Sequence, residues 1–103
     1  MTEQELEARR IPIEWYVPES IVSRYATNIV VQHGEHEFVI SFHEMQPPVL
    51  LGTPEEVEAG LEQIESIRAN CVARVVVAAE RMPDFIQVLQ ESLARYSSKK
   101  EAE

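Results

Sequence analysis

Residues 24–45 read RYATNIVVQHGEHEFVISFHEM, and their pattern predicts a β-hairpin. Apolar side chains alternate with polar or small ones on both sides of Gly34-Glu35, which is the period of β-strands. Glycine at the first position of a two-residue loop is typical of a type II′ turn. This turn would set the register, with the expected pairs His33–His36, Val31–Phe38 and Ile29–Ile40. One face of the hairpin is then apolar and the other is mixed.

Four further segments have patterns of regular structure. Ile11–Val17 alternates and is bounded by prolines, which suggests a short edge strand. Thr53-Pro-Glu-Glu has the N-cap, first-turn proline and capping-box glutamate of a helix, which we expect over residues 54–67. Val72–Ala79 predicts a strand with two apolar faces, and residues 80–96 carry the wide apolar stripe of a C-terminal helix.

The predicted fold is therefore α+β: a small antiparallel β-sheet of three to four strands, a short amphipathic helix and a long C-terminal helix. The chain of 103 residues is long enough for one small domain. We expect that domain to span residues 11–96. Residues 1–10 are predicted to form a flexible acidic arm and residues 97–103 a flexible tail.

Strand 72–79 implies that both faces of the sheet must be covered. A single helix covers only one face, and a chain of this size buries only about 65% of its unfolded surface. We expect a homo-oligomer, either a dimer or a tetramer, or a different protein partner, to complete the second face. In the alternative, helix 54–67 folds over that face within one chain.

Charge excludes some classes of partner. The formal net charge is −9, and the acidic residues are spread along the chain. Nucleic acids and anionic membranes require a basic surface, so neither is an expected partner. The single cysteine, Cys71, cannot form an internal disulfide, which fits a cytoplasmic protein. Its apolar surroundings predict a small buried side chain rather than a catalytic thiol.

The sequence contains no pattern of an enzyme site, so we expect neither catalysis nor a cofactor. Two histidines at the hairpin tip, His33 and His36, are weak candidates for a metal site, because two imidazoles and a nearby glutamate make an incomplete ligand set. Exposed aromatic and apolar side chains are typical of binding surfaces. The candidate interface residues are Trp15, Tyr16, Val30, Val39, Arg74 and Val76. Arg74 lies among valines and is expected to need an acidic partner.

Three short segments carry a resemblance to a known family. They are Tyr25-Ala-Thr-Asn28, Glu37-Phe-Val-Ile-Ser-Phe42 and Ala73-Arg-Val-Val76, followed by the C-terminal helix. Over residues 20–96 the chain resembles a family of small bacterial proteins known as domain of unknown function 3467. The resemblance implies the order hairpin, strand, helix, and no activity or catalytic residue. Helix 54–67 departs from the pattern as an insertion, and Ala79 stands where a capping serine often precedes the last helix.

These patterns favour a non-enzymatic, oligomeric protein-binding or adaptor module. The order of strands followed by a helix in an acidic protein is also similar to the SecB export chaperone, at the level of the fold alone. A peptide-binding chaperone of that kind is one alternative. A small metal-binding protein that uses the hairpin-tip histidines is another.

Overall fold

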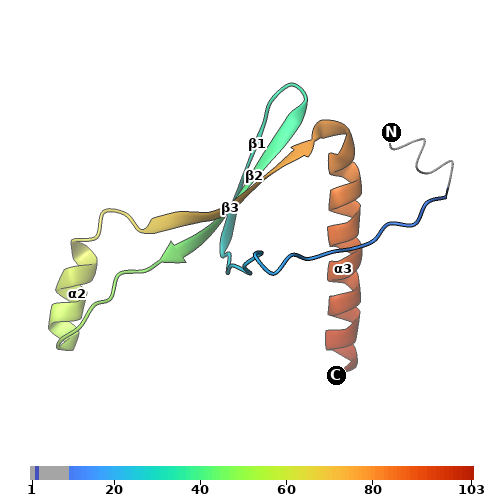
Figure 1. Ribbon diagram of the computed structural model, residues 1–103. Helices are drawn as coiled ribbons and strands as arrows, with labels where there is room; N and C mark the ends of the chain where they lie inside the picture. Colours follow the sequence, from blue (N-terminus) through green and yellow to red (C-terminus); the bar gives the residue numbers. More distant parts are fainter. Residues whose placement is uncertain (1, 3–9) are drawn as a thin grey trace.

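The computed structural model describes residue 2 and residues 10–103, and in this part of the chain it contains one three-stranded sheet and two helices. The elements are β1 (Asn28–His33), β2 (Glu37–Gln46), α2 (Pro54–Glu62), β3 (Arg68–Ala78), the 3₁₀ turn η1 (Ala79–Arg81) and α3 (Met82–Ala102). The strands are antiparallel in the order β1-β2-β3 (Figure 1). The predicted α+β class is confirmed. The arm expected at residues 1–10 lies outside the described residues except at positions 2 and 10.

The hairpin forms as predicted, but its turn lies one residue later. The Gly34 N–H donates to the Glu37 carbonyl at 2.9 Å, so the two loop residues are Glu35 and His36. Gly34 does not adopt a positive φ, and the predicted type II′ turn is therefore wrong. The observed pairs are His33↔Phe38, Val31↔Ile40 and Ile29↔Phe42. Each partner has moved by two residues, which leaves every side chain on its predicted face because the side-chain period of a strand is two.

Strand β3 begins earlier than predicted, at Arg68 instead of Val72, because the chain continues to pair with β2 beyond a β-bulge. Phe42 pairs with Ala73 and His43 with Cys71, which leaves Val72 as the extra residue of β3. The sheet has two faces. The face that α3 approaches, here the α3 face, carries Ile29, Val31, Phe38, Ile40, Phe42, Ala73, Val75 and Val77. The opposite face, here the open face, carries Val30, Val39, Ser41, Arg74 and Val76.

Both helices differ from their predicted lengths. In α2, Thr53 caps the first turn as predicted, since its Oγ1 accepts from the Glu56 N–H at 3.2 Å. The helix stops at Glu62 instead of residue 67, because its last turn has no basic side chain to favour the helix dipole. Helix α3 passes the expected end at Tyr96 and continues through the segment predicted as a tail. Residues 97–102 contain no proline or glycine, and the lysines of the last turn favour the dipole.

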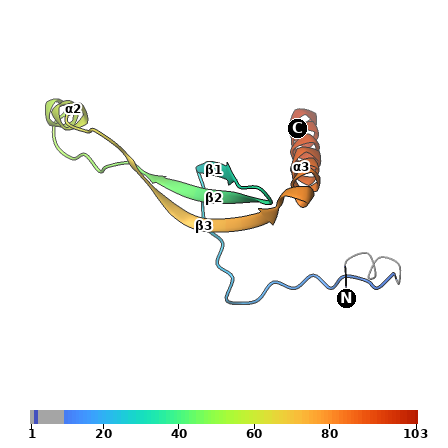
Figure 2. The same cartoon turned by 90° about the horizontal axis from the view of Figure 1, so that it is seen from above.

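Residues 11–17 do not form the predicted edge strand, and they lie apart from the sheet. The segment is extended but pairs with no strand, and a turn follows, in which the Ile21 N–H donates to the Pro18 carbonyl at 3.1 Å. In Figure 2, α2 and α3 stand at opposite ends of the sheet on its concave side. Residues 11–22, here the extended segment, run on the other side.

The chain has almost no core of its own. Among the described residues only Val77 and Ser41 are buried, each with 4% of its surface exposed. The radius of gyration is 20.7 Å, against about 13 Å for a compact chain of this length. Helix α2 therefore does not cover the open face, which was the alternative to an oligomer. None of the helices in the described part of the chain has the length and apolarity needed to cross a membrane.

Candidate functional site

A groove lies between the α3 face and the first turns of α3. Its volume is about 430 Å³. Strands β2 and β3 contribute one wall and α3 the other, and the lining residues are Ile40, Phe42, Val75, Val77, Phe85, Val88 and Leu89. All seven are apolar. The groove can therefore take up aliphatic or aromatic side chains, and it offers no side-chain hydrogen bond to a charged ligand.

The local sequence explains where α3 begins and which of its side chains line the groove. Pro83 lies in the first turn of α3, where its missing N–H breaks no helical hydrogen bond. Arg81 and Asp84 form an i,i+3 ion pair at 3.6 Å where the helix begins. Phe85 and Leu89 are spaced one turn apart and so share a face of the helix. Beyond Leu89, the helix faces no part of the sheet, and Leu93 and Tyr96 are exposed.

The open face holds four of the predicted interface residues. Val30 and Val76 are exposed and Val39 is half-buried between them. The Nε of Arg74 donates to Oγ of the buried Ser41 at 3.4 Å. A neutral hydroxyl thus occupies the position at which we had expected an acidic partner. The valines provide an apolar surface that no described element of the chain covers.

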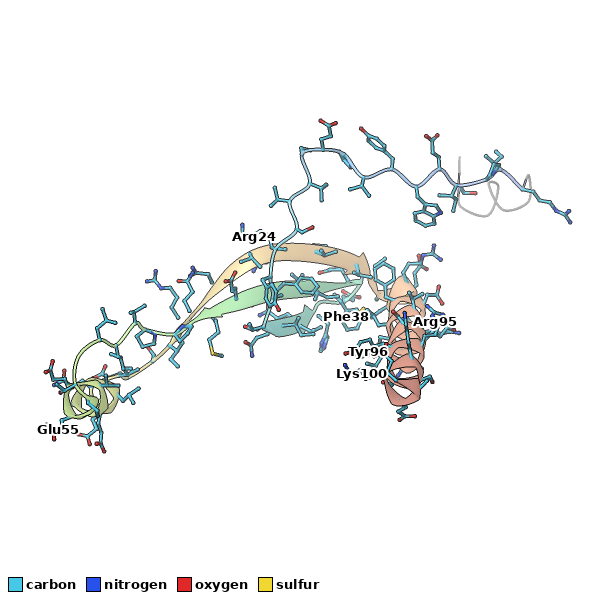
Figure 3. The ribbon with its side chains drawn as sticks, turned by 90° about the horizontal axis from the view of Figure 1, so that it is seen from below. Arg24, Phe38, Glu55, Arg95, Tyr96 and Lys100 are labelled. Atoms are coloured by element: carbon cyan, nitrogen blue, oxygen red, sulfur yellow. The ribbon has the colours of Figure 1, made fainter. Side chains whose placement is uncertain are left out.

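The other two predicted interface residues lie on the extended segment. Trp15 has 86% of its surface exposed, and Tyr16 is exposed as well. Figure 3 shows the side chains of this segment projecting clear of the sheet. The segment also carries Ile13, Val17 and Ile21, all exposed. The apolar side chains of the extended segment therefore have no surface to pack against. Conversely, the open face is an apolar surface that no described element covers.

The two hairpin-tip histidines have different neighbours. His33 packs against Phe38, with ring centroids 5.8 Å apart. His36 lies at the turn, with Nε2 3.7 Å from a Glu35 carboxylate oxygen. The described residues contain no group of three or more His, Cys, Asp or Glu side chains placed to hold a metal ion.

Cys71 is exposed, which corrects the expectation of a buried thiol. The residue lies directly beyond the bulge of β3, in the last row of the sheet that all three strands share, where Asn28, His43 and Cys71 pair. Its Sγ approaches the Ala73 carbonyl oxygen at 3.5 Å. Among the described side chains, no histidine or acid is hydrogen-bonded to it.

Sequence reasoning identified the strands and helix that form the groove, but it did not name the groove as a site. The signal was present in two patterns: the run Val75–Val77, apolar on both faces, and the stripe that contains Phe85 and Leu89. These patterns do not predict the distance between the helix and the sheet. A stripe that packs tightly on a sheet and one that leaves a groove have the same periodicity.

Comparison with known proteins agrees with the resemblance noted in the sequence. A family model described as "Protein of unknown function (DUF3467)" matches residues 1–101, nearly the whole chain. The match also includes the segment 54–67, which we had interpreted as an insertion. No curated protein matches the chain, and no solved structure does.

Proposed function

The chain belongs to the DUF3467 family of proteins of unknown function, and we propose that it is a non-enzymatic, homo-oligomeric module that binds apolar segments of other proteins. The observation that carries the proposal is the wholly apolar groove between α3 and the sheet. A second copy of the chain completes the sheet, and the groove receives the partner.

The amount of exposed surface supports self-association. The accessible surface of the chain is 9757 Å². A compact monomer of 11.8 kDa exposes about 5,900 Å². The difference, about 3,800 Å² per chain, is several times the roughly 800 Å² per partner of a standard interface, and it is more than the roughly 1,000–2,500 Å² that each partner of an obligate homodimer buries. Much of it is apolar, including the exposed side chains of α3 and of the extended segment.

The chemistry of the groove and the charge of the chain define the partner class. An apolar groove of this kind accepts the apolar face of a helix or the side chains of an extended chain. With a net charge of −9, the protein attracts segments whose flanks are basic and repels acidic ones. The partner we propose is therefore an apolar protein segment next to lysines or arginines. Unfolded polypeptides of this composition, the ligands of a SecB-like chaperone, belong to the same class.

Two measurements on the full chain test the proposal. Size exclusion with light scattering gives the mass in solution, and we expect a discrete dimer or tetramer of the 11.8 kDa chain. Fluorescence anisotropy then measures binding of two labelled, unfolded model peptides that share an apolar segment and differ in basic or acidic flanks. We expect the basic peptide to bind more tightly, with a difference that shrinks as salt increases.

A matched pair of variants locates the binding site. Leu89 lies in the groove, whereas Leu51 lies in the loop before α2, and both are exposed. Leu89→Gln should weaken peptide binding several-fold, and Leu51→Gln should leave it unchanged. A monomeric wild-type chain would contradict the oligomer, and absence of peptide binding, or equal effects of the two variants, would contradict the groove as the binding site.

A further inference from the structure

The outer edge of β3 is the least protected feature of the sheet. β3 has 11 residues and lies at the edge, because the strand order is β1-β2-β3. The opposite edge strand, β1, has six residues. Natural edge strands are usually blunted by proline, by charged side chains, by a β-bulge or by a covering element. The bulge of β3 lies at Val72, outside the regular stretch of residues 73–78. β3 contains neither proline nor lysine, and no described element covers its outer side.

Hydrogen bonding shows which backbone groups of β3 are available. The Ala79 N–H donates to the His36 carbonyl at 2.9 Å, so the alternation of an antiparallel ladder turns the N–H and C=O groups of Val75 and Val77 toward β2. Those of Arg74, Val76 and Ala78 point outward. Three consecutive outward-facing residues are enough to pair with another strand.

The charge of this edge does not oppose pairing. Arg74 is the one charged side chain of β3 between the bulge and η1. Because its Nε donates to Ser41 Oγ on β2, the guanidinium is drawn inward across the sheet, away from the edge. In an antiparallel pairing of two copies centred near Val76, each Arg74 lies opposite a small or apolar residue of the other copy, so the two guanidiniums do not face each other.

We propose that β3 pairs with β3 of a second copy, so that two chains form one continuous six-stranded sheet. The proposal rests on the homo-oligomer of the proposed function and names its interface. The area argument above favours a second copy as the occupant, since the surface exposed beyond that of a compact monomer is large enough for the interface of an obligate homodimer. An identical edge is also complementary to itself across a two-fold axis.

This pairing has a consequence for the groove. The α3 face of each copy becomes part of one apolar face that is twice as wide, with an α3 helix from each copy above it. Helix α3 departs from the end of β3, so the added strands extend the face on the side from which the helix leaves. The binding site for an apolar segment is then shared by the two copies and is incomplete in one chain.

Cysteine cross-linking tests the interface directly. In a Cys71→Ser background, Val76→Cys places a thiol near the two-fold axis. Val30→Cys is the matched control, because Val30 is on the same face and is also exposed, but it lies on β1. With strands about 4.8 Å apart, the two Val30 positions of a six-stranded sheet are more than about 20 Å apart. A short bis-maleimide should link the Val76→Cys chains into dimers at low protein concentration and leave the Val30→Cys chains unlinked.

A proline pair provides the second test. Val76→Pro removes an outward-pointing N–H and should lower the mass in solution while the chain keeps its far-ultraviolet circular dichroism. Val75→Pro removes an N–H that bonds to β2 and should unfold the sheet. If the wild type is an oligomer but Val76→Cys does not cross-link, or Val76→Pro keeps the full mass, the β3 interface is wrong and the proposed function stands. A monomeric wild type would overturn both.

Discussion

The sheet is held together by contacts within the chain, and the segments attached to it are not. The three strands bond to one another through a continuous ladder and hold the buried residues Val77 and Ser41. Helix α2, the C-terminal half of α3 and the extended segment form their local structure without packing on the sheet (Figure 1). The three strands therefore pair within one chain, whereas in the proposed oligomer the attached segments depend on contacts between chains.

The largest expected effect falls on the sheet. Val77→Asp places a carboxylate at the most buried apolar position of the described chain, among the apolar side chains of the α3 face. Burying an unpaired charge costs several kcal/mol, so we expect the sheet to lose its cooperative unfolding transition. Val30→Asp is the control, because that side chain is exposed and should cost less than about 1 kcal/mol. Urea unfolding followed by circular dichroism distinguishes the two. Equal effects would mean that the sheet has no core.

A substitution in α3 tests whether the exposed part of this helix packs against a second copy. Leu93 of α3 has 63% of its surface exposed, so in a single chain Leu93→Ala should change the free energy of unfolding by less than about 0.5 kcal/mol. If a second copy covers α3, the cost rises to about 2 kcal/mol and the unfolding midpoint depends on protein concentration. We expect the second result. Gln90→Ala, on the same helix, should have little effect in either case.

Two glycines allow a finer comparison between a loop and the hairpin. Gly52, before α2, has a φ of 124°, which side chains rarely adopt, so Gly52→Ala should destabilise the local structure by about 1 kcal/mol or more. Gly34 at the hairpin lies outside that region, and an added Cβ would meet only the end of the flexible Glu37 side chain. Gly34→Ala should therefore be nearly neutral. A large loss of stability in Gly34→Ala, measured by thermal unfolding, would restore the type II′ turn that the sequence suggested.

The hairpin shows how far sequence reasoning can reach. Alternation of side chains gave the correct faces for Ile29 and Phe42, because any register of the right parity preserves them. The exact pairing depended on which residues occupy the turn, and Gly34 was a misleading signal since its conformation is one that any residue can adopt. The capping residues of α2 were also identified correctly, because capping is a local interaction.

The features that the sequence did not reveal depend on distances between elements. The groove exists because α3 approaches the sheet only through side chains near Phe85 and Leu89, and no periodicity encodes that spacing. The extended segment was misread as a strand for a related reason. Ile13 and Trp15 alternate as strand residues do, but a strand also needs a neighbour with which to pair, and no described strand lies beside them.

The smallest predicted effect concerns the cap of α2. Thr53→Ala removes the oxygen that accepts from the Glu56 N–H at 3.2 Å, a loss of about 1 kcal/mol in helix stability. Since the ribbon of α2 stands away from α3 and from most of the sheet (Figure 2), that loss should appear as fraying of residues 54–62 and should not change the global free energy of unfolding. Amide hydrogen exchange resolves the two quantities, with faster exchange in α2 and unchanged exchange in β2. If exchange in β2 also accelerates, α2 is coupled to the sheet through a contact that forms only in the oligomer. The stability of the sheet would then depend on contacts between chains as well as on those within one chain.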